Sequence, residues 1–235
     1  MVCCSQPGLL FCEDVMQVFQ SMLMASVALV AVTTLQANIT GTETEVTVQE
    51  NVLIYTGPLS QDANTRAAAL LKQFPQVQTL KITSQGGEIG LGMDLGDLVY
   101  AHQLNVEVGQ YCFSSCANYV FPAGNIKYLN WRSQLGWHGG AMQPMQFDDA
   151  DMEQAYQQYI GPMRARETAF FQKIQVQQAS TTAGQAPEYA RYQDCIGWRY
   201  TRQKMQSFGI DQVRYKQLIW LPKSSFKQQC IFTIR

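Results

Sequence analysis

Three short stretches of this chain carry the residue types that acyl transfer requires. The glycine pair Gly86-Gly87 follows an apolar stretch and can turn the backbone so that its N–H groups face a ligand. Ser114 and Ser115 stand among small residues, and a serine becomes a nucleophile when a base lies beside it. His138 follows a further apolar stretch, and histidine is the usual base near neutral pH. Together these residues would supply an oxyanion cradle, a nucleophile and a proton acceptor.

The segments between these stretches predict strands that alternate with helices. Apolar runs and turn residues predict strands within residues 46–55, 77–83, 106–108, 126–129 and 133–137. Helical periodicity and Ser60 as an N-cap predict helices over 60–74 and 88–103, and a third that begins near 114–117 and ends at 123–124. This alternation is typical of a mostly parallel sheet built by right-handed crossovers, which is an α/β fold.

The second half of the chain reads differently. Residues 148–178 predict a long helical excursion that breaks near Gly161-Pro162. A second helical stretch is expected over 187–208, followed by strand-like segments at 218–220 and 230–232.

Bulk composition excludes several classes of function. The chain of 235 residues has a net charge of −1 and only 15% charged residues, so no basic face indicates a nucleic-acid partner. No cluster of histidine and cysteine has zinc spacing, and we expect neither a metal nor a cofactor.

The N-terminal part predicts export. Residues 19–37 form an uncharged apolar run, so we expect residues 1–37 to be a signal or membrane-anchor segment. In an alternative interpretation, residues 1–15 are a misassigned start and the protein begins after them. Residues 38–45 read as a polar linker. The protein would then be periplasmic or anchored facing outside the cytoplasm. Beyond this segment the cysteines are even in number, which allows disulfides or buried free thiols: Cys112, Cys116, Cys195 and Cys230.

The order of the motifs resembles a known superfamily. Strand, Ser-x-Gly-Gly, helix, strand, Gly-x-x-x-x-Ser-Ser-Cys-Ala, Ala-Gly, strand and Gly-x-His follow one another. This order is similar to that of the ClpP/crotonase fold and its Clp-type and signal-peptide-peptidase-type serine peptidases, especially exported ClpP-like proteins with Cys-x-Ser-x-Cys around the serine. The resemblance covers residues 46–138 well and 187–214 weakly. It implies repeated ββα units and a mostly parallel sheet in a domain over 46–235, with the helical excursion at 148–178.

The resemblance also implies roles for individual residues. Gly86 and Gly87 match the loop whose N–H groups line the oxyanion hole. Counting back from Ala123-Gly124 without a gap places the nucleophile on Ser115, with Cys116 as the second oxyanion donor. Counting from the flanking cysteines places it on Ser114. We favour Ser115, because a gap inside a buried helix would rotate all later side chains by about 100°.

The remaining roles fall to His138 and an acid. His138 matches the family's base, and Asp194 lies near the position of the aspartate that orients it. A serine hydrolase of peptidase type, acting on a peptide or protein and self-associating through 148–178, is therefore the first hypothesis. A non-catalytic binding or assembly module with the same fold is the second, and a crotonase-like thioester enzyme is the third.

Overall fold

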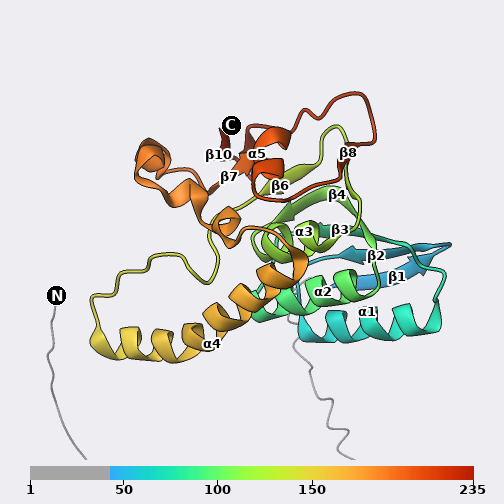
Figure 1. Ribbon diagram of the computed structural model, residues 1–235, viewed down its shortest axis with the longest axis horizontal. Coiled ribbons are helices and arrows are strands. Elements are labelled where there is room, and N and C mark those ends of the chain that lie inside the picture. The colour runs from blue at the N-terminus through green and yellow to red at the C-terminus, as the bar shows by residue number, and fades with distance from the viewer. Residues whose placement is uncertain (1–42) are drawn as a thin grey trace, which may run out of the picture. The chain divides into compact units, whose positions relative to one another are not determined.

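The computed structural model describes residues 43–235, and a seven-stranded sheet forms their centre (Figure 1). Strands β1 and β2 pair antiparallel, and every other pairing in this sheet is parallel. β6 pairs with the second half of β4, beyond β5. The strands in spatial order are β1 (Glu45–Gln49), β2 (Val52–Thr56), β3 (Thr79–Ser84), β4 (Asn105–Phe113), β5 (Lys127–Leu129) and β8 (Val213–Tyr215), with β6 (Gln134–Gly136) beside β4. The α/β class with a mostly parallel sheet is confirmed.

Helices α1 (Gln61–Gln73) and α2 (Ile89–Ala101) run side by side along one face of the sheet (Figure 1). Ser60 caps α1 as expected, its Oγ accepting a hydrogen bond from the Ala63 N–H at 3.2 Å. Alternate residues of β3, such as Leu80 and Ile82, are fully buried in the core. The intervening Lys81 therefore belongs to the opposite face of the sheet.

The helix after β4 is not a regular α-helix. It begins as a π-helix, η1 (Cys116–Val120), and continues as the short α3 (Phe121–Ala123). Within η1 the Phe121 N–H donates to the Cys116 carbonyl, which is an i→i+5 bond. A π-turn holds one residue more than an α-turn. The direction of Ser114 around the helix axis, relative to the end of α3, therefore differs from that in a regular α-helix.

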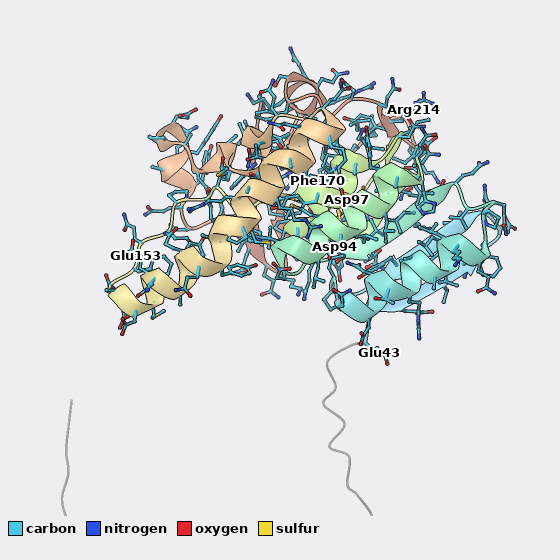
Figure 2. All side chains as sticks on the ribbon, turned by 60° about the horizontal axis from the view of Figure 1, so that its bottom comes forward. Glu43, Asp94, Asp97, Glu153, Phe170 and Arg214 are labelled. Carbon is cyan, nitrogen blue, oxygen red and sulfur yellow. A yellow bond between two sulfur atoms is a disulfide. The ribbon has the colours of Figure 1, made fainter. Side chains whose placement is uncertain are left out.

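The long helix α4 (Ala150–Ile174) runs unbroken through Pro162, so the break expected near Gly161-Pro162 is wrong. Pro162 is exposed, as is Gln158, whose carbonyl loses its helical donor and can be hydrated. The C-terminal half of α4 packs on α2: Phe170 is buried, and Arg166 pairs with Asp94 at 2.6 Å. Figure 2 shows Asp94 and Asp97 facing this half, whereas Glu153 lies at the far end. This packing holds the helix together despite the proline.

The expected helix over 187–208 and strand over 218–220 are wrong. Before this region lie two 3-10 turns, η2 (Gln178–Thr181) and η3 (Ala183–Gln185); the region itself begins with a third, η4 (Pro187–Tyr192), and contains one short α-helix, α5 (Arg202–Ser207). A second sheet has the order β7 (Gly197–Tyr200), β10 (Gln229–Ile234) and β9 (Ser225–Phe226). The disulfide between Cys195 and Cys230 joins the entrance of β7 to β10. Residues Gly197–Tyr200 form a strand because β10 pairs with them, and the local helical periodicity of the sequence does not reveal this distant partner.

The expected signal or anchor segment, residues 1–37, lies outside the described residues, as do residues 38–42 of the expected linker. Within residues 43–235, no helix combines the length and the apolar composition needed to cross a membrane.

Candidate active site

The three motifs meet at one edge of the central sheet because their strands are neighbours. β3 and β4 pair Ser84 with Cys112, and β4 and β6 pair Phe113 with Gly136. The strands are parallel, so their carboxyl ends emerge together, which is where open α/β sheets bind ligands. The residues that follow these ends are Gly86-Gly87, Ser114 and His138. The fold therefore brings together the glycine pair, the serine pair and the histidine.

The glycine loop lies directly against the serines. Gly86 has φ +95°, and a Cβ there would stand 2.6 Å from the Phe113 carbonyl oxygen and 2.7 Å from the Ser114 Cβ. Only glycine allows this close approach. The Gly86 N–H donates to Ser84 Oγ at 3.1 Å and is thus engaged inside the loop. Of the two glycine amides expected to line an oxyanion hole, Gly87 is therefore the better candidate.

Ser114 occupies the sharp turn between β4 and η1 with φ +55°, in the left-handed region that non-glycine residues rarely adopt. Its N–H donates to the Gly136 carbonyl at 3.0 Å, which ties it to the strand that leads to His138. The side chain is partly exposed. Strained backbone of this kind is concentrated at active sites and ligand clamps.

Ser115 points elsewhere. It is 2% exposed, and its Oγ donates to the Gly87 carbonyl at 2.7 Å. A Cβ added to Gly92 on α2 would lie 2.8 Å from the Ser115 Cβ, so Ser115 packs against α2. Counting back from Ala123-Gly124 assumes a regular helix. This helix contains a π-turn, which holds one residue more than an α-turn, so the count does not by itself decide between Ser114 and Ser115.

Cys112 and Cys116 form a disulfide, so residues 112–116, which include Ser114, form a covalently closed loop. Cys116 is fully buried. This bond connects the end of β4 to the first turn of η1 and restricts the turn that presents Ser114.

His138 is exposed and follows Trp137, whose backbone forms an antiparallel bridge with Trp198. The His138 ring stacks beside the Phe113 ring, with centroids 6.5 Å apart. Desolvation by the surrounding protein lowers the pKa of His138, and a hydrogen bond to its own backbone opposes this shift in part. A histidine with a lowered pKa is neutral, and so able to accept a proton, at neutral pH.

The structure does not join Asp194 to His138. Asp194 is exposed on the turn between η4 and β7, and among residues 43–235 no carboxylate forms a hydrogen bond with the His138 ring. Gln185 approaches from the same region and donates to the His138 carbonyl at 3.3 Å. This region therefore contacts the base through a side-chain amide that bonds to the His138 backbone, and not through a carboxylate that bonds to the imidazole ring.

Two buried residues that the sequence reading did not single out hold the site together. The Asn118 N–H donates to the Ser114 carbonyl at 2.8 Å, and its Nδ2 donates to the Gly139 carbonyl at 2.6 Å. Glu167 on α4 accepts from the Tyr119 hydroxyl at 2.6 Å and from the Ala141 N–H at 3.0 Å. Both residues connect η1 to the loop after His138. Asn118 interrupts a stretch of small and apolar residues, which is a weak sequence signal, whereas Glu167 stands between Arg166 and Thr168 and gives no such signal.

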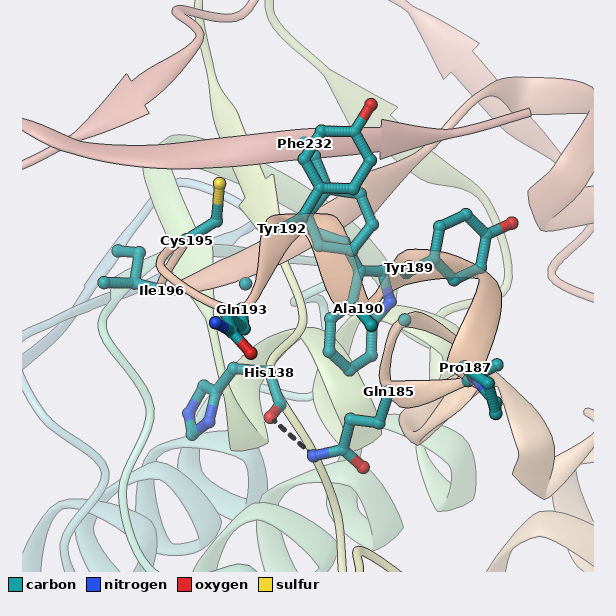
Figure 3. Close-up of a pocket in the computed structure, with 14 residues that line it drawn as sticks. His138, Gln185, Pro187, Tyr189, Ala190, Tyr192, Gln193, Cys195, Ile196 and Phe232 are labelled. Atoms are coloured by element: carbon teal, nitrogen blue, oxygen red, sulfur yellow. Dashed lines mark hydrogen bonds between the residues drawn. The ribbon is translucent and has the colours of Figure 1, made fainter.

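A pocket of about 300 Å³ opens beside His138 (Figure 3). Figure 3 shows Gln185 reaching the His138 carbonyl, with the imidazole on the other side of that backbone. No aspartate, glutamate, lysine or arginine lines this pocket, and its wall includes the aromatic residues Tyr189, Tyr192, Trp198 and Phe232. No cluster of three or more histidine, cysteine or acidic residues able to hold a metal ion occurs in the described part of the chain.

Neither a family model nor a curated protein matches the chain. Among solved structures it is similar to a point mutant of ClpP1 from Listeria monocytogenes, with a TM-score of 0.45 and 16% sequence identity over 70% of this chain and 90% of that one. A likeness at this level assigns neither a family nor an activity. The arrangement of the described residues has to carry the functional assignment.

Proposed function

We propose that this protein is a serine hydrolase of peptidase type with a ClpP/crotonase-like fold, in which Ser114 is the nucleophile and His138 the base. One observation carries the proposal. A strained, partly exposed serine, a glycine loop in contact with it and a histidine of lowered pKa emerge from three neighbouring parallel strands. Ser115, the alternative nucleophile, is buried and hydrogen-bonded to Gly87.

The proposed reaction begins when His138 takes the Ser114 proton and the Ser114 oxygen bonds to the carbonyl carbon of a peptide. The oxyanion that forms would accept hydrogen bonds from the Gly87 and Ser115 N–H groups. A Cβ on Gly86 would lie 2.9 Å from the Ser115 nitrogen, so the glycine loop and this amide are adjacent. The C–N bond then breaks, His138 gives its proton to the leaving amine, and water releases the acyl group. The Ser115 amide thus takes the part expected for Cys116.

Labelling of the full chain with a serine-directed fluorophosphonate tests the assignment. Ser114→Ala and His138→Ala should abolish labelling, whereas Ser115→Ala should retain it. Ser207, exposed on α5, provides a matched control as Ser207→Ala. A folded wild type that takes no label would favour the binding module with the same fold, and labelling lost in Ser115→Ala alone would return the nucleophile to Ser115.

Ser115→Ala should affect stability rather than chemistry. The substitution removes the hydrogen bond to the Gly87 carbonyl, so we expect the free energy of unfolding to fall by about 1 kcal/mol. The label should still attach, a few-fold more slowly, because the glycine loop loses this hydrogen bond to the residue that begins η1. Urea unfolding and the labelling rate, measured on the same preparation, check both effects.

The pH dependence of labelling follows from His138. Its pKa is below the ordinary value of 6.5, so the imidazole stays neutral through pH 7 and becomes protonated only under more acidic conditions. We therefore expect the labelling rate to be flat near neutral pH and to fall with decreasing pH, with a midpoint below 6.5. A midpoint above that value would contradict a base whose pKa the surrounding protein lowers.

Self-association and export stay predictions. The N-terminal half of α4 is exposed and bears acidic residues in its first turn, including Asp151 and Glu153. We propose that this half of α4 contacts a second copy of the chain. Light scattering of the full chain tests this proposal, and a monomer would contradict it.

A further inference from the structure

A large groove lies over the face of the central sheet that α1 and α2 leave open. Its volume is about 720 Å³, more than twice that of the pocket beside His138. Its floor consists of outward-facing residues of β3 and β4, among them Lys81, Thr83 and Tyr111. Its walls come from the loop between β5 and β6 and from the segment that leads into β9 and beyond it. The groove is large enough for several residues of an extended peptide.

The charge in this groove is strongly positive. Four exposed cationic side chains line it: Lys81, Arg132, Lys223 and Lys227. Glu107 is the only carboxylate in the lining, and it already pairs with Lys216, which does not line the groove, and with Lys81 at 3.8 Å. Because the whole chain has a net charge of −1, this accumulation of positive charge is local. Such a surface attracts anionic groups.

The groove is continuous with the candidate active site. Lys227 Nζ donates to Gln85 Oε1 at 2.9 Å, and Gln85 immediately precedes the glycine pair. Aromatic rings complete the path: Tyr111 contacts Phe226, with centroids 5.0 Å apart, and Phe226 stacks on Phe113, also at 5.0 Å. Phe113 in turn stacks beside His138. A ligand in the groove would therefore reach the residues proposed for catalysis along one row of side chains.

We propose that this groove binds a carboxylate-bearing segment of the peptide substrate and gives the protein a preference for acidic peptides. The inference rests on the proposed function, because it places the rest of the substrate relative to Ser114. Lys223, Lys227 and Arg132 would pair with carboxylates, and the rings of Phe226 and Tyr111 would contact the peptide between them. The carboxylates could be side chains of aspartate and glutamate or the C-terminus of the peptide.

Peptide binding to the full chain tests the proposal in the Ser114→Ala background, where no turnover interferes. Fluorescence anisotropy would compare three probes: an amidated peptide rich in glutamate, its glutamine counterpart, and that counterpart with a free C-terminus. We expect the glutamate peptide to bind roughly tenfold more tightly than its amidated glutamine counterpart at about 50 mM salt, with a smaller difference at about 300 mM. The variant with both Arg132→Gln and Lys223→Gln should lose most of this preference.

Lys72→Gln is the matched control, since Lys72 is equally exposed but lies on α1 at the other face of the sheet. It should leave the preference unchanged. Preference for the free C-terminus over the amidated form would support the groove with the chain end as its ligand. Equal binding of all three probes, a preference that survives the double variant, or tighter binding of an oligothymidylate would overturn the proposal.

The two proposals fail separately. Fluorophosphonate labelling of the wild type without selective peptide binding would overturn the groove and leave the hydrolase standing. Selective peptide binding without labelling would support the groove and overturn the hydrolase.

Discussion

Ser114→Gly should abolish labelling and hydrolysis and yet give a more stable protein than Ser114→Ala. Both variants lack the hydroxyl, so both should lose activity by several orders of magnitude. Only glycine adopts φ +55° without strain. After the greater freedom of glycine in the unfolded chain is taken into account, we expect the glycine variant to be more stable than the alanine variant by roughly 0.5–1 kcal/mol. Urea unfolding with the disulfides intact measures this difference.

Arg66 supplies the comparison for this effect. It is exposed in the middle of α1, where glycine is less favourable than alanine by about 1 kcal/mol, so the glycine variant should be the less stable of the two there. If Ser114→Gly is the less stable of its pair, the turn is not strained at this residue. If either Ser114 variant keeps the label, Ser114 is not the nucleophile.

Glu167→Ala should cause the largest loss of stability, about 3–5 kcal/mol. Glu167 is fully buried, and its carboxyl group accepts hydrogen bonds from Tyr119, Ala141 and Gln178. Alanine would leave the buried Tyr119 hydroxyl and Ala141 N–H without this acceptor, would remove the acceptor of the half-buried Gln178 amide, and would open a cavity between α4 and η1. Because Ala141 follows the His138 loop, we also expect the labelling rate to fall. Denaturant unfolding and labelling at a temperature where the variant is folded test the two effects.

Glu167→Gln preserves the size of the side chain and one acceptor oxygen, so its cost should be smaller, about 1–2 kcal/mol. Glu153→Ala, on the exposed end of the same helix, should change the stability by less than about 0.5 kcal/mol. If Glu167→Ala were no more destabilising than Glu153→Ala, the buried network would not hold α4 against η1.

The sequence alone determined the elements whose signals are local. Ser60 and the apolar face after it define α1, and the apolar residues before Ser84 define β3. The order of the glycine pair, the serines and the histidine predicted that they would meet, because the carboxyl ends of neighbouring parallel strands lie at one edge. These features depend on nearest neighbours along the chain or on a general rule of sheet topology.

The tertiary structure decided what depends on distant contacts. No local pattern in residues 114–124 indicates a π-turn, and only the folded chain shows that Ser115 is buried with its Oγ bonded to the Gly87 carbonyl while Ser114 stays partly exposed. Likewise α4 continues through Pro162 because α2 supports its C-terminal half.

The C-terminal region shows the same limit. Residues 197–200 form a strand because β10, some thirty residues later, pairs with them and a disulfide joins Cys195 to Cys230. Likewise, the cationic side chains that line the groove beside Gln85 come from β3, from the loop between β5 and β6, and from the C-terminal segment. Local patterns can predict a helix or strand that neighbouring residues stabilise. A helix register, a strand partner or a charged groove instead depends on interactions between residues that are distant in the sequence and that only the fold brings together.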